Sequence, residues 1–178
     1  MKKIFLLLAT PAILVLASCG GSKSDEASME NMKEIKFAML GDSLSIMVPD
    51  SVQGNLKITD QQWGATEIKI GEKFQISVQQ QDGDIALVKS DIERNDVFKL
   101  QKYITDEPNL LFWEAKNPEM EPANFHFYTI QKIGNTPYEI KDVDSGEAYS
   151  EGNVQAMIGA AKTLKKRGAS AAEGEAHP

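Results

Sequence analysis

The sequence predicts one α+β domain, with a mainly antiparallel sheet of about six to eight strands, a mid-chain helix and a C-terminal helix. Short runs that alternate between apolar and polar residues outnumber the stretches of helical period, and turn residues rather than helices join most of them. Of the 178 residues, the two ends lack such patterning. The remaining stretch, residues 34–167, is long enough for a single core.

The first half of the domain contains four predicted strands, residues 34–39, 43–48, 66–70 and 74–78. Gly41-Asp42 suits a hairpin turn between the first two strands, and Pro49 ends the second. Residues 52–63 are mostly polar and are predicted to form a loop. The last two runs are either two strands that turn at Gly71-Glu72 or one bent strand. Their alternation is typical of an antiparallel sheet covered on one face.

A helix over residues 84–95 is predicted next, because Asp82 or Asp84 can cap it and Ile85, Val88 and Ile92 form one apolar side. Four further strands are predicted over residues 97–105, 110–115, 124–133 and 138–143. Gly134-Asn135 suits a turn between the last two.

Ser150 is the predicted cap of the C-terminal helix, and its apolar stripe comprises Val154, Met157, Ile158, Ala161 and Leu164. Lys165-Lys166-Arg167 is predicted to lie in its last turn, because cations suit the negative end of a helix, and Gly168 is predicted to stop it. Residues 168–178 lack periodicity and are predicted to be a disordered tail.

This layout resembles the PsbP-like (Mog/PsbP) fold: an opening hairpin ending at a proline, a helix, meandering strands and a final helix. The matching segments are residues 37–49, 84–95, 97–143 and 150–166. The aromatic residue that commonly follows the proline in that family is absent, since Asp50-Ser51-Val52 stands there, and no functional residue can be carried over. The resemblance implies an architecture and a non-enzymatic binding or assembly role.

The start of the chain has the features of an export signal. Met1-Lys2-Lys3 is basic, and residues 4–16 are apolar but too short for a bilayer, which needs about 20 such residues. Leu16-Ala17-Ser18-Cys19 resembles the bacterial lipobox. The resemblance implies a lipoprotein whose signal peptide, residues 1–18, is removed, with a diacylglycerol on the Cys19 sulfur and a fatty acid such as palmitate on its new amine. The alternative is an ordinary cleaved secretory signal.

Cys19 is the only cysteine, so no internal disulfide is possible. Residues 19–33 are predicted to form a flexible tether. Gly20 is not the aspartate that retains proteobacterial lipoproteins at the inner membrane, and Lys23-Ser24-Asp25-Glu26 resembles the charged export signal of Bacteroidota surface lipoproteins, with Ser24 interrupting it. We therefore expect an outer-membrane anchor, with the domain on the periplasmic or the surface face.

The chain is acidic, with 19 lysine and arginine residues against 26 aspartate and glutamate residues. That balance argues against nucleic acid as a partner, because phosphates require clustered basic side chains. The predicted partners are the membrane, through the lipid, and an envelope protein. No phosphate-binding glycine loop occurs, and no cofactor is predicted.

Gly41-Asp42-Ser43-Leu44 spells the nucleophile block of the GDSL esterases, and a serine esterase using Ser43 is the alternative function. That chemistry needs a base and an orienting acid, which the family supplies as Asp-x-x-His. Ala123 and Gly174 stand three residues before His126 and His177, so neither histidine fits. We therefore predict a hairpin turn at this motif and no catalytic residue.

Asp142-x-Asp144-x-Gly146 resembles the start of a calcium loop, but the positions that need glycine and glutamate hold Glu147 and Asn153. A strand ending in a polar turn is the preferred interpretation. His126 has no cysteine or second histidine nearby, so no zinc site is predicted. It is expected to be a half-exposed sheet residue that shares a face with Tyr128, with a ligand or pH-sensing role as the alternative.

The aromatic residues Phe112, Trp113, Phe125 and Phe127 are predicted to build the core. Trp63 lies in a polar segment, and it either binds a partner or folds back over the sheet. The main functional hypothesis is a membrane-anchored, non-catalytic binding or assembly domain. A purely structural tethered domain is a further possibility.

Overall fold

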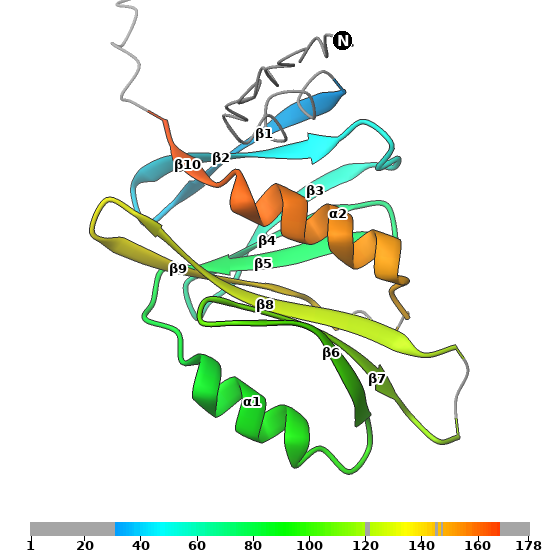
Figure 1. The fold of residues 1–178 in the computed structure, drawn as a ribbon. Coiled ribbons are helices and arrows are strands. Elements are labelled where there is room, and N and C mark those ends of the chain that lie inside the picture. Colours follow the sequence, from blue (N-terminus) through cyan, green and yellow to red (C-terminus); the bar gives the residue numbers. More distant parts are fainter. Residues whose placement is uncertain (1–30, 120–121, 145, 147, 168–178) are drawn as a thin grey trace, which may run out of the picture. The chain divides into compact units, whose positions relative to one another are not determined.

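The computed structural model describes residues 31–119, 122–144, 146 and 148–167 (Figure 1). These residues form two helices and ten strands, and the strands are arranged in two sheets. The predicted signal peptide, Cys19, the tether up to residue 30, Gly168, the tail and His177 lie outside the described residues. Within the described part, neither helix is long and apolar enough to cross a membrane.

The smaller sheet has three antiparallel strands in the order β1-β2-β10. Its hairpin is formed by β1 (Met32–Met39) and β2 (Asp42–Pro49), which turn at Leu40 and Gly41, one residue earlier than the predicted Gly41-Asp42 turn. Both turn residues have positive φ, 49° at Leu40 and 86° at Gly41. Positive φ is unusual for leucine, which gains nothing from burial here because its side chain is 70% exposed.

The larger sheet has seven antiparallel strands in the order β3-β4-β5-β9-β8-β7-β6. The strands are β3 (Leu56–Asp60), β4 (Ala65–Ile70), β5 (Phe74–Gln79), β6 (Lys99–Glu107), β7 (Leu110–Lys116), β8 (Asn124–Ile133) and β9 (Thr136–Asp142). The α+β class is as predicted. Because Gly71 turns the chain at φ 59°, β4 and β5 are two strands and not one bent strand.

The prediction of a loop over residues 52–63 is wrong, because β3 lies inside it and pairs with β4. Leu56 is 48% exposed and Ile58 38% exposed. As the edge strand of the sheet, β3 satisfies its backbone through one neighbour and needs no continuous apolar face. Leu56 and Ile58 do alternate with polar residues, but the alternation is too short to stand out from the polar residues around it.

The predicted end of the C-terminal helix is also wrong. Helix α2 (Glu151–Lys162) begins at a capping box between Ser150 and Asn153, but it ends before the basic run. The Thr163 hydroxyl donates to Ala160 O and accepts from Met47 N, both at 2.7 Å, which turns the chain toward β2. Lys165–Lys166 then pair with the open edge of β2 as β10.

Two apolar clusters lie on opposite faces of the larger sheet. The main core lies between this sheet, α2 and the smaller sheet, and contains Ile46, Phe74, Phe127, Tyr138 and Met157 among others. On the other face, helix α1 (Ile85–Glu93) covers β6, β7 and β8 (Figure 1). Its N-cap is Asp84, one of the two predicted candidates, with Leu87 N donating to the Asp84 carboxylate at 3.0 Å. This smaller cluster has Ile92, Leu111 and Tyr128 at its centre.

Candidate functional site

A groove opens beside the smaller cluster, where α1 leaves part of the sheet uncovered. One hollow of about 280 Å³ lies between α1 and strands β7 and β8, and a second of about 410 Å³ continues toward β9. Val88, Trp113, His126 and Asp144 line both hollows, so they form one continuous groove. Its size and its mixture of apolar walls with a few polar groups are typical of small-molecule sites.

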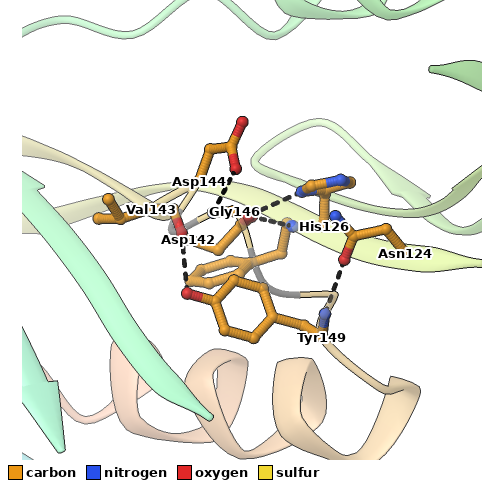
Figure 2. A network of polar contacts seen from close by, with 8 residues as sticks. Asn124, His126, Asp142, Val143, Asp144, Gly146 and Tyr149 are labelled. Carbon is orange, nitrogen blue, oxygen red and sulfur yellow. Dashed lines mark hydrogen bonds and ion pairs between the residues drawn. The ribbon is translucent and has the colours of Figure 1, made fainter. Parts of the chain in front are cut away.

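His126 lies on β8 and is held in place by Asp142 at the end of β9 (Figure 2). Its Nδ1 lies 2.7 Å from Asp142 Oδ2, and the other carboxylate oxygen accepts from Phe127 N at 2.7 Å. The Asp142 side chain is only 6% exposed, and that of His126 18%. Since a carboxylate can only accept, the His126 Nδ1 carries the proton, and a neutral ring keeps Nε2 as an acceptor.

The indole of Trp113 stacks on His126, with ring centroids 5.5 Å apart and planes 28° apart. The two residues are direct cross-strand partners on β7 and β8. The prediction that Trp113 belongs to the core with Phe112 is wrong, because neighbours on a strand face opposite ways. Phe112 and Phe127 enter the main core, Phe125 packs partly buried against it, and Trp113 packs under α1.

The wall beyond β9 is fixed by short polar contacts (Figure 2). Tyr149 N donates to Asn124 Oδ1 at 2.7 Å, and the Tyr149 hydroxyl donates to Val143 O at 2.8 Å. Asp144 Oδ1 accepts from Gly146 N at 3.0 Å, which is the polar turn that the sequence predicted here. Among the described residues, no group of His, Cys, Asp or Glu side chains is arranged to hold a metal ion.

The far end of the groove carries a second polar network, centred on Glu139. Its carboxylate accepts from Tyr128 Oη at 2.8 Å and Gln81 Nε2 at 2.7 Å, and forms an ion pair with Lys141 at 3.0 Å. Burial works to raise the pKa of Glu139, but these three donors outweigh it, so the pKa lies below its usual value. Burial and the bond to Glu139 both raise the pKa of Tyr128. The network is therefore a neutral tyrosine and a charged carboxylate at neutral pH.

Gly83 allows the segment before α1 to lie against β8. A Cβ at this position would clash with the Tyr128 hydroxyl and would lie 2.8 Å from Ile130 Cγ1. The close approach of this segment to β8 therefore depends on the absence of a side chain at Gly83.

The sequence-predicted site residues do not meet in one place. Ser43 is exposed on β2, in the smaller sheet, whereas His126 lies on β8 and bonds to Asp142. Asp42 instead pairs with Lys166 at 2.7 Å and accepts from Tyr138 Oη at 3.3 Å. Trp63 is 65% exposed in the turn between β3 and β4, so the expectation that it folds back over the sheet is wrong. Cys19 lies outside the described residues.

The groove itself was missed at the level of sequence, although its residues were singled out separately. Trp113 was assigned to the core, His126 to a sheet surface and Val88 to a helix stripe. A strand pairing that sets Trp113 opposite His126 would have brought the three together, but sequence alternation does not reveal which strands pair.

No protein-family model matches the chain, and neither a search of curated proteins nor one of solved structures finds a match.

Proposed function

We propose that this chain is a bacterial envelope lipoprotein, anchored to the outer membrane through a lipid on Cys19, whose domain binds a ligand without catalysing a reaction. The ligand lies in the groove between α1 and strands β7 to β9. The proposal has two parts, a cellular location and a binding site, and each is supported by different residues.

The location at a membrane is supported by the lipobox-like run that ends at Cys19. The domain's first strand begins at Met32, which leaves a short polar segment after the cysteine. Two or three acyl chains on one residue give stable anchoring, whereas one chain is marginal. The layout that resembles the PsbP-like fold supports a binding role only by analogy, since a fold does not determine a function.

The binding site is supported above all by the fixed orientation of the His126 ring. Asp142 fixes the ring through Nδ1 and Trp113 stacks on it, while its Nε2 stays available at an open groove. Fixed polar groups in an apolar hollow bind with little loss of conformational entropy. The same arrangement supports binding rather than ester hydrolysis, because Ser43 lies in the other sheet.

The test is recovery of bound material from the native envelope with the lipidated protein. We expect Trp113→Ala to lose the bound material and Trp63→Ala, a matched change of an exposed tryptophan, to keep it. Loss with Trp63→Ala alone would move the binding site to the β3–β4 turn and contradict the groove. The mass of the purified chain tests the lipid anchor, because an unmodified Cys19 or an intact signal peptide would contradict the proposed membrane location. Esterase activity abolished by Ser43→Ala would contradict a non-catalytic role.

A further inference from the structure

We infer that the groove takes an organic cation, an amine or guanidinium group carried on a small apolar body. This inference rests on the proposed binding function of the same groove and adds the chemical class of the ligand. It follows from the hydrogen-bonding capacity that the described residues leave open, from the charges around the groove, and from its apolar walls.

Carboxylates stand on both sides of the hollow beside α1. Asp91 on α1 accepts from Arg94 Nη2 through Oδ1 at 2.7 Å, and Asp144 accepts from Gly146 N through Oδ1. Each therefore keeps its second oxygen for a ligand. Both side chains are exposed, so Arg94 only partly offsets the charge of Asp91.

His126 adds a third acceptor in its neutral form, because Nδ1–H donates to Asp142 and the lone pair of Nε2 is left for a ligand. No lysine or arginine lines the hollow beside α1 among the described residues. The amide groups of Asn95 and Asn124 can donate, but they bring no positive charge to hold an anion. The one lysine in the continuation toward β9, Lys141, is already paired with Glu139.

The remaining lining is apolar and suits the body of such a ligand. Val88, Ile92 and Phe98 face the hollow from α1 and the segment after it, and Trp113 and Ala115 face it from β7. An indole attracts cations through its ring as well as packing against methylene groups. A hollow of about 280 Å³ fits an alkylamine, a benzylamine or the side chain of a lysine or arginine residue.

The chain has two tryptophans, Trp63 and Trp113, which allows a direct test. In the full-length Trp63→Phe protein, Trp113 is the only tryptophan, and its fluorescence reports on the groove. Titration with benzylamine, benzyl alcohol and benzoate compares a cation, a neutral molecule and an anion of nearly the same shape. We expect saturable binding of benzylamine, with a preference on the order of tenfold over the other two, as expected for two exposed charge pairs.

The variants locate the effect. Asp91→Asn with Asp144→Asn should weaken benzylamine binding by about two- to fivefold per removed charge, whereas Asp50→Asn, in the turn after β2, should leave it unchanged. Equal or stronger binding of benzyl alcohol or benzoate would overturn the inference and leave the groove as a binding site of another class. Benzylamine binding that ignores the Asp91 and Asp144 changes would overturn it as well. No response to any of the three probes would overturn it too, and the recovery experiment with Trp113→Ala would then decide separately whether the groove binds.

Discussion

Replacing Asp142 with alanine tests the support of the groove directly. The carboxylate makes two bonds of 2.7 Å, one to His126 Nδ1 and one from Phe127 N, and its side chain is 6% exposed. In Asp142→Ala the buried amide of Phe127 loses its partner in the sheet, and the His126 ring loses the contact that orients it. Both effects act at the junction of β8 and β9, beside the groove.

The expected loss is about 3 kcal/mol, because a bond to a charged group contributes about 1.5–3 kcal/mol and an orphaned buried amide costs a comparable amount. For a domain of this size that lowers the melting temperature by about 10 °C. Asp142→Asn keeps an oxygen for Phe127 N, and His126 can change tautomer to accept from the new amide. This matched variant should lose only about 1 kcal/mol.

Thermal unfolding followed by circular dichroism measures both variants, and hydrogen exchange at the Phe127 amide reports the local bond. Faster exchange is expected in Asp142→Ala and near-normal exchange in Asp142→Asn. A melting temperature of Asp142→Ala equal to that of the original protein would refute the reasoning. Equal destabilisation by alanine and asparagine would refute the role assigned to the oxygen that Phe127 N contacts.

Three further predictions concern other parts of the domain. Gly83→Ala should destabilise the protein by about 1–3 kcal/mol, because the new Cβ overpacks against Tyr128, and hydrogen exchange in α1 should rise more than in α2; equal exchange in both helices would contradict this. Because the pKa of Glu139 is lowered from its usual 4.5, its carboxylate stabilises the fold at pH values above 4.5, and this contribution is lost as the pH falls through the folded-state pKa. The stability of Glu139→Gln should therefore fall less steeply under acid than that of the original protein. An unchanged acid profile would show that the carboxylate is not stabilised by folding. Trp63→Ala should change the free energy of unfolding by less than about 0.5 kcal/mol, since the side chain is 65% exposed. A large loss of stability in thermal unfolding would mean that Trp63 packs against the domain in solution.

Most of the elements could be predicted because their signals are local. The cap at Asp84 and the alternation in β4, β5 and β8 depend on neighbouring residues, and they coincide with observed elements. β3 and β10 depend on distant partners. The first is an exposed edge, and the second pairs with β2 through a basic run that suits a helix end equally well.

The groove needed the same kind of distant information. The pattern Phe125-His126-Phe127 correctly placed His126 on the face opposite Phe127. It did not reveal that Asp142 would meet His126 or that Trp113 would stack on it, because both contacts follow from the order of β7, β8 and β9 in the sheet. The sequence thus contained the residues of the candidate site but not their assembly.

Photo-crosslinking from two adjacent positions on α1 tests the proposed groove most directly. A photoreactive diazirine residue in place of Val88 faces the groove, whereas the same residue in place of Leu87, which is 56% exposed, lies outside the groove lining. In the native envelope, we predict an adduct from position 88 that is absent from position 87 and that disappears when benzylamine is added in excess. The same adducts from both positions, or none from position 88 in a folded protein, would contradict a ligand in the groove.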